Sequence, residues 1–357
     1  MNLTFRLIAG SLLAFVVTAI AAWGALALWF TLPFADKPRG ALALVFAALG
    51  LGGLLIAALR RRVAPLLPFV VACGAVLVWW GSIEASNARA WQADVARLPS
   101  AEIEGDLVTL RNVRKFDYRS AADYTENWYD RTVDLSQLEA LDLIAVYWMG
   151  DAIAHTMLSF VFTHGEPVTI SIETRKEQGE DYSTLAGFFR RYELYYVVGD
   201  ERDLIGLRTT YREPPEDVYL YRVHAPRENV RRLFLDYLAK INRLHEHPEF
   251  YNTGTTNCTT NIVTHIRAIR KGVPLNWKML LSGHFPELVY EYGALDQSLT
   301  FETLRRQSRI NDRARAADGA DFSCRIREGL PGMPVMISTC EGAPDAAEWR
   351  ALAPPDS

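Results

Sequence analysis

The sequence lacks the residue patterns of several common kinds of functional site. It has four cysteines and seven histidines among 357 residues, and no three or four of them have the regular spacing that a metal site needs. It has no glycine-rich phosphate-binding motif and no Gly-x-Ser-x-Gly turn around a nucleophilic serine. The net charge is −4 and no cationic stripe stands out, which argues against a nucleic acid partner. The sequence therefore predicts no metal, no cofactor and no nucleic acid.

Charge is also scarce in the first 86 residues, where three apolar runs lie at 7–30, 40–59 and 64–80. The first two are long enough to span a bilayer, and the third is near the lower limit, since a span needs about 20 residues. The arginines at 60–62 should lie in the cytoplasm, which places everything after the third run outside. The first run alone could be a cleaved signal peptide, but two further spans follow it at once. We therefore expect three transmembrane helices over 1–86.

The remaining chain has the composition of one soluble domain over 87–335, followed by an Ala/Pro/Glu-rich tail at 336–357 that we expect to be disordered. Residues 87–100 are expected to form a linker helix and 301–317 a basic helix. Several short strand-like runs precede a helical pattern at about 228–244. These runs predict an α+β domain with an antiparallel sheet.

A β-hairpin around a three-residue loop at 163–165 is the best-defined element of this domain. With Gly165 in the left-handed conformation, alternate residues of both strands form an apolar core face. A one-residue slip would break the alternation on both strands together, so the pattern determines the register. The predicted register pairs Thr156 with Ile172, Leu158 with Ile170, Phe160 with Val168 and Phe162 with Glu166.

This register places His155 directly opposite Glu173. A histidine at the end of a strand is often a surface or hydrogen-bonded residue. A carboxylate across the strand would instead hold one ring nitrogen and leave the other free to face a thiol. The pair is therefore a candidate base with its orienting residue.

Cys258 is the one cysteine in a setting that favours a thiolate. It follows Thr255, Thr256 and Asn257, which are good N-cap residues, and a helix from 258 to about 271 is expected. The unpaired N–H groups and the dipole at the start of this helix would stabilise a thiolate. The alternative is a small buried core cysteine.

The other three cysteines have different expected states. Cys73 lies inside the third apolar run and is expected to be inert. Cys324 and Cys340 lie in the exported part of the chain, where a disulfide between them is chemically permitted.

Five short segments carry a resemblance to a known family: 155–160 (HTMLSF), 170–175 (ISIETR), 192–197 (YELYYV), 200–203 (DERD) and 257–262 (NCTTNI). They resemble the bacterial family named for the N-terminal periplasmic domain of Lnb, a lipoprotein N-acyltransferase, over roughly 90–330. That family is similar to a circularly permuted branch of the papain-like NlpC superfamily, in which the histidine strand precedes the cysteine helix. The resemblance implies Cys258 as the nucleophile and His155 as the base, with Glu173 as the candidate orienting residue.

These observations lead to an expected function. The chain is expected to be a multi-pass protein of the bacterial inner membrane, with a periplasmic thiol acyltransferase or hydrolase domain that acts on lipid or lipoprotein acyl groups. A papain-like peptidase or amidase that acts on cell-wall peptides is one alternative. A non-catalytic membrane scaffold with a structural cysteine is the other. The acyl donor, the acyl acceptor and the oligomeric state stay open.

Overall fold

The computed structural model describes residues 3–270, 272–317, 319 and 321–333; the tail predicted to be disordered, 336–357, lies outside the described residues. The chain divides into two compact units. The membrane unit comprises Met1–Ser86 together with Tyr182–Glu193. The soluble unit comprises Asn87–Asp181 and the chain from Leu194 onward. Residues 182–193, which the sequence pattern grouped with the soluble domain, thus belong to the membrane unit.

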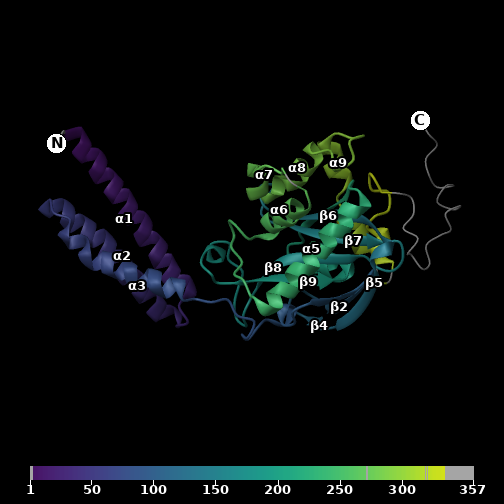
Figure 1. The fold of residues 1–357 in the computed structure, drawn as a ribbon, viewed down its shortest axis with the longest axis horizontal. Helices are drawn as coiled ribbons and strands as arrows, with labels where there is room; N and C mark the ends of the chain where they lie inside the picture. The colour runs from purple at the N-terminus through teal and green to yellow at the C-terminus, as the bar shows by residue number, and fades with distance from the viewer. Residues whose placement is uncertain (1–2, 271, 318, 320, 334–357) are drawn as a thin grey trace. The chain divides into compact units, whose positions relative to one another are not determined.

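The membrane unit contains three apolar helices, each long and apolar enough to cross a membrane (Figure 1). They contact one another through small residues and aromatic rings. A Cβ atom on Gly24 would lie 2.3 Å from the ring of Phe46, so the first two helices approach this closely only with glycine there. The ring of Phe46 in turn lies 5.3 Å from that of Phe69 in the third helix. The three spans are α1 (Leu3–Thr31), α2 (Asp36–Arg60), and η1 (Ala64–Leu66) continuing into α3 (Leu67–Gly81).

The segment Tyr182–Glu193 packs against the ends of α1 and α3, although it lies far from them in the sequence. The ring of Phe189 lies 5.6 Å from that of Phe30 and 6.3 Å from that of Trp80. Arg190 donates hydrogen bonds to the carbonyl oxygens of Trp80, at 2.7 Å, and Ile83, at 3.0 Å. Trp80 is in the last turn of α3, so the guanidinium lies at the negative end of that helix, where a cation is stabilising.

The soluble unit is built on an eight-stranded mixed sheet with the order β1-β2-β9-β8-β7-β6-β10, and β5 pairs with β2. Most pairs are antiparallel, as expected, but β2 and β9 run parallel. A small separate sheet consists of β3 (Asp117–Tyr118) and β4 (Tyr124–Thr125). The main strands are β1 (Ser100–Glu104), β2 (Leu107–Arg114), β5 (Trp128–Asp134), β6 (Leu138–Tyr147), β7 (Ala154–Phe162), β8 (Val168–Arg175), β9 (Glu193–Gly199) and β10 (Asp217–Val223).

The predicted hairpin is β7 and β8, and its register is confirmed. Leu158 pairs with Ile170 and Phe160 with Val168, and Gly165 has a φ of 81° at the turn. Both faces of the hairpin are buried, since Met157 and Ser159 on the second face are as inaccessible as Phe160 on the first. The sheet is therefore the middle layer of the soluble unit.

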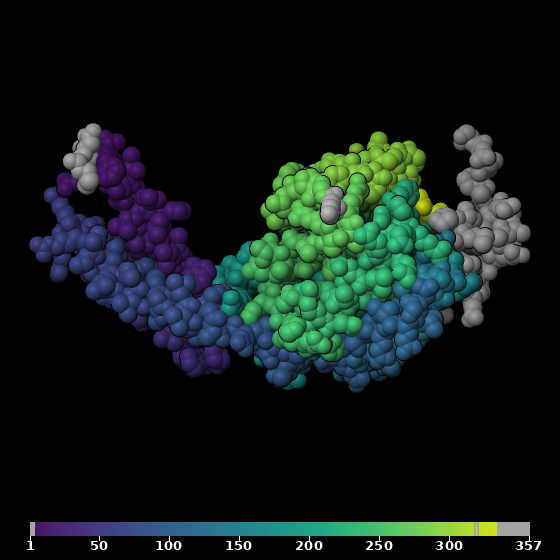
Figure 2. Space-filling model, in the orientation of Figure 1, coloured from purple at the N-terminus to yellow at the C-terminus, as the bar shows by residue number. Residues whose placement is uncertain are grey.

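Helices cover both faces of the sheet. On one face, α5 crosses in front of the strands in Figure 1, and the ring of its Phe234 lies 4.7 Å from that of Phe160 in β7. On the other face, Met157 packs in one apolar cluster with Leu204 and Ile310. The first set, which Figure 2 shows in green on the near face, is α5 (Arg227–Glu246), α6 (Cys258–Ile269), α7 (Trp277–Leu280) and α8 (Phe285–Glu291). The second set is α4 (Glu201–Gly206), the π-helix η5 (Leu207–Tyr211), α10 (Asn311–Ala316) and α11 (Phe322–Arg325).

Two expected helices are absent or interrupted. Residues 87–100 contain one short 3-10 turn, Ala93–Val95, because Trp91 pairs with Glu177 and its ring packs against the guanidinium of Arg175. The expected basic helix at 301–317 is two helices, α9 (Phe301–Gln307) and α10. Backbone hydrogen bonds to β10 interrupt it: Ile310 donates to Val218, and Leu220 donates to Ser308.

Candidate active site

Cys258 is the first residue of α6, where the sequence predicted it. Asn257 caps the helix: its side-chain oxygen accepts from the backbone N–H of Thr260, and the Thr260 hydroxyl accepts from the backbone N–H of Asn257, both at 2.9 Å. This reciprocal capping satisfies two of the backbone donors at the helix start. The N–H groups of Cys258 and Thr259 belong to the first turn, which has no intrahelical acceptors for them. The sulfur therefore lies at the positive end of a capped helix.

His155 comes from the start of β7 and lies beside Cys258. The hydroxyl of Thr156, the next residue on the strand, is 3.0 Å from that of Thr259, which joins β7 to the first turn of α6. The Sγ atom of Cys258 lies 3.9 Å from the same Thr259 hydroxyl, and His155 is close enough for its charge to lower the pKa of the thiol. The structure thus brings the predicted nucleophile and the predicted base together in one site.

Glu173 holds the His155 ring from the neighbouring strand. The Nε2 atom of His155 lies 3.1 Å from the Oε1 atom of Glu173 and 2.7 Å from the hydroxyl oxygen of Ser171. Ser171 itself donates to the same carboxylate oxygen at 2.7 Å. Because Nε2 is engaged by these two groups, Nδ1 is the ring nitrogen left for the thiol. The cross-strand contact that the hairpin register predicted is present.

Arg208, from the π-helix η5, completes the site on the far side of Glu173. Its guanidinium donates to Glu173 Oε1 at 2.7 Å, and its side chain is only 4% exposed. When Cys258 is a thiolate and His155 is protonated, the charges alternate along the site. Cys258 is negative and His155 positive, and Glu173 is negative and Arg208 positive. Such alternation keeps each buried charge beside an opposite one, which is what a low-dielectric site requires.

The electrostatics of the site favour the thiolate–imidazolium pair. Burial alone would raise the pKa of Cys258, but the attraction and hydrogen bond of His155, with those of Thr156, lower it from 9.0 to about 7. Burial alone would lower the pKa of His155, but the charges of Glu173 and Cys258 raise it to about 9. Despite its burial, Glu173 has a pKa well below its usual range because of His155 and Arg208. Between about pH 7 and pH 9 the pair is therefore ionised.

Residues 124–283 match the family model of the Lnb N-terminal periplasmic domain. This part of the chain is similar to that family, which is the one that the sequence motifs indicated. The matched segment includes Cys258, His155 and Glu173, and also Ser171 and Arg208. No curated protein and no solved structure matches the chain. With the three apolar helices, the match indicates a membrane protein with an Lnb-type periplasmic domain.

The 3-10 turn Ser282–His284 is joined to the chain just before His155. The hydroxyl of Ser282 accepts from the N–H of Ala154 at 3.0 Å, and the Gly283 carbonyl accepts from the hydroxyl of Tyr147 at 2.7 Å. A Cβ atom on Gly283 would lie 2.0 Å from the carbonyl oxygen of Asp151, so only glycine fits there. The loop thereby fixes the chain just before the histidine. His284 packs against Trp277, and no interaction between the described residues joins His284 to the Cys258 sulfur.

The other two cysteines that the structure describes do not contribute to the site. Cys73 is a free thiol in α3, and Cys324 takes part in a disulfide. Cys340, its expected partner, lies outside the described residues.

Ser171, Thr156 and Arg208 are the site residues that the sequence analysis did not single out. The hairpin pattern contained a signal for Ser171, since it lies on the same strand face as Glu173 and two residues before it. Arg208 had a weaker signal, as a lone arginine in the otherwise uncharged run Leu204–Thr210. A buried arginine needs an anionic partner, but nothing in the sequence identifies Glu173 as that partner.

Proposed function

We propose that this protein is a thiol acyltransferase or hydrolase in which Cys258 is the nucleophile and His155 the general base and acid. The observation that carries the proposal is a capped helix-start cysteine beside a histidine that a carboxylate orients. This is the geometry that nucleophilic catalysis by a thiol requires. Glu173 is a positioning residue, because it holds the imidazole and touches no substrate atom.

The chemistry follows from the charges of the pair. The Cys258 thiolate attacks the carbonyl carbon of an ester or amide, forming a C–S bond while the negative charge moves to the carbonyl oxygen. The N–H groups of Cys258 and Thr259 are placed to donate to that oxygen. When the C–O or C–N bond breaks, protonated His155 gives its proton to the leaving alcohol or amine, and a thioester remains. An amine or water, deprotonated by His155, then attacks the thioester, and the thiolate leaves.

The fold and location are part of the proposal. The histidine strand β7 precedes the cysteine helix α6 in the chain, which is the order of the circularly permuted papain-like NlpC branch. Three spans would anchor the soluble unit in the inner membrane, with the site on the periplasmic side. Membrane lipids and lipoproteins are then the most abundant acyl compounds near the site, which favours them over a soluble substrate.

The test is a search for a thioester at Cys258. The full chain is expressed in bacterial membranes that contain phospholipids with alkyne-tagged acyl chains, and the tag is located by mass spectrometry. We expect a hydroxylamine-sensitive tag on Cys258 that is absent from Cys258→Ala. The matched control is Cys73→Ser, which removes the other free thiol of the described residues and should leave the tag in place.

Two results would contradict the proposal. A tag of equal yield on Cys258→Ala would show that the cysteine is not the acyl carrier. Cleavage of cell-wall peptides by the wild-type chain, with no lipid tag, would show that it is a peptidase. The mass of lipoprotein N-termini with and without the chain then identifies whether an amine is the acceptor.

A further inference from the structure

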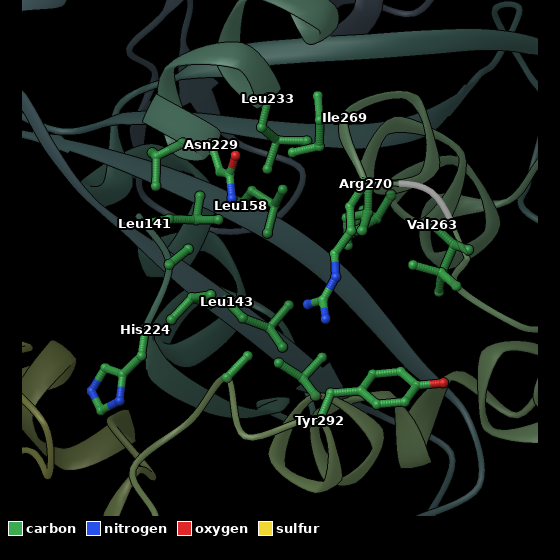
Figure 3. A pocket seen from close by; sticks show the side chains of 18 of the residues that line it. Leu141, Leu143, Leu158, His224, Asn229, Leu233, Val263, Ile269, Arg270 and Tyr292 are labelled. Atoms are coloured by element: carbon green, nitrogen blue, oxygen red, sulfur yellow. The ribbon is translucent and has the colours of Figure 1, made fainter. Parts of the chain in front are cut away.

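A cavity of about 190 Å³ lies in the soluble unit between the sheet and the helices α5, α6 and α8 (Figure 3). All but four of its lining side chains are apolar; the exceptions are His224, Asn229, Arg270 and Tyr292. Fully buried apolar side chains form its floor, while His224, Arg270 and Tyr292 are exposed. The cavity is therefore mostly apolar inside, where the half-buried Asn229 is its one polar lining side chain among the described residues, and it is polar at its mouth. An engineered cavity of about 150 Å³ with such a lining stays dry and takes up small apolar ligands.

The cavity lies about one helical turn from Cys258, which is not itself one of its lining residues. On α6, Ile262 lines it and is one helical turn from Cys258, a rise of about 6 Å. On β7, Leu158 lines it and lies two residues from Thr156 on the same face of the strand, about 7 Å away. Because the Thr156 hydroxyl lies 3.0 Å from that of Thr259, the residue after Cys258, both elements lead from the site toward the same apolar space.

The cavity then follows α6 to its end. The helix contributes a stripe from Ile262 through Ile266 to Ile269. Figure 3 shows Ile269 at the end of this stripe, with Arg270 after it. At 1.5 Å per residue, the stripe is about 10 Å long. An apolar space that lies one helical turn from Cys258 and opens at the surface fits a hydrocarbon chain. Among its described lining residues, only the half-buried Asn229 could pair with a peptide inside, so most of a peptide backbone would be left without partners there.

We propose that this cavity holds the hydrocarbon chain of the acyl group, with the carbonyl at Cys258 and the chain along Ile262, Ile266 and Ile269. The proposal rests on the proposed acyl transfer for the position of the carbonyl. The cavity also sets chain-length preference, because each methylene that it buries contributes about 0.8 kcal/mol, about fourfold in affinity, until the space is full.

The test uses a palmitic acid that carries a photoreactive diazirine on its chain. The full chain with Cys258→Ala is placed in lipid nanodiscs, so that binding is measured without thioester formation. Irradiation followed by peptide mapping should find the label on α6 and on α5 or α8. We expect Ile266→Phe, which fills the cavity, to reduce this label at least tenfold. Ala268→Phe adds the same ring to the exposed side of the same helix and should leave the label unchanged.

A third variant guards against a folding defect in Ile266→Phe. Ile266→Ala enlarges the cavity. When unlabelled fatty acids of increasing length compete with the diazirine-labelled palmitic acid, the fatty acid that competes best should be longer for Ile266→Ala than for wild type. Label confined to α1–α3, or equal label in Ile266→Phe and Ala268→Phe at similar melting temperatures, would overturn the proposal. A thioester at Cys258 with no change in chain preference between Ile266→Ala and wild type would also overturn it and leave the proposed function intact. Cavity label without any thioester would support the cavity and refute the function.

Discussion

Replacing His155 by alanine tests the ion pair at the centre of the site. The replacement removes both the charge and the hydrogen bond that lower the pKa of Cys258 to about 7, while burial, which raises that pKa, stays. The pKa should therefore return to 9.0 or above. At pH 7 the thiolate fraction then falls from about one half to about one hundredth or less, a loss of about 50-fold.

The expected change in reaction rate is smaller than the loss of thiolate. A thiolate of higher pKa is the better nucleophile, with a Brønsted coefficient of about 0.45, so two pKa units return about eightfold. The rate of alkylation by iodoacetamide at pH 7 should therefore fall by about sixfold in His155→Ala. The midpoint of the pH–rate profile should move from about 7 to 9 or above, which is the more specific observable.

The measurement is alkylation of Cys258 followed by mass spectrometry in the full chain, over pH 5 to 10. The matched control is His164→Ala, which removes a histidine from the exposed tip of the same hairpin and should leave the midpoint near 7. A His155→Ala midpoint that stays within about half a unit of wild type, in a chain that is still folded, would refute the reasoning about the ion pair.

Two further predictions concern the residues around the pair. Glu173→Gln removes the carboxylate charge that raises the pKa of His155 to about 9, so the His155 imidazolium should be lost at lower pH. The alkaline limb of the pH profile of thioester formation should therefore move toward neutrality. An alkaline limb that does not move would contradict the role of Glu173. Asn257→Ala removes the cap of α6 and should lower the free energy of unfolding by about 1 kcal/mol in thermal or denaturant unfolding. The control Thr264→Ala, on the exposed face of the same helix, should lower it less. An equal effect of the two substitutions would argue against the contribution of the cap.

The sequence was sufficient to predict the central part of the site because the information was local. The alternation of apolar residues around Gly165 determined the hairpin register, and the register brought Glu173 to His155. The capping residues before Cys258 likewise predicted the start of α6. In both cases neighbours in the sequence decide the geometry, so a pattern read from one sequence can find it.

The features that the sequence did not predict depend on partners far away in the chain. Arg208 reaches Glu173 across 35 residues, from a π-helix that no local pattern indicated. The helix expected at 301–317 is interrupted at Ser308–Ile310 because these residues pair with the edge of β10. The expected linker helix at 87–100 is replaced by contacts of Trp91 with Arg175 and Glu177. In each case tertiary contacts outweigh helix propensity, which is worth less than about 1 kcal/mol per residue.

The chain passes between its two units three times, after Ser86, before Tyr182 and after Glu193. A protease that cuts only at Ser86 would therefore not free the soluble unit, because two covalent connections would remain. A fragment that starts at Asn87 would still carry Phe189 but would have lost Phe30 and Trp80, the rings against which it packs. To prepare the soluble unit in water, the loop at 182–193 should therefore be replaced as well as the spans removed; otherwise the fragment is expected to self-associate through the uncovered aromatic surface.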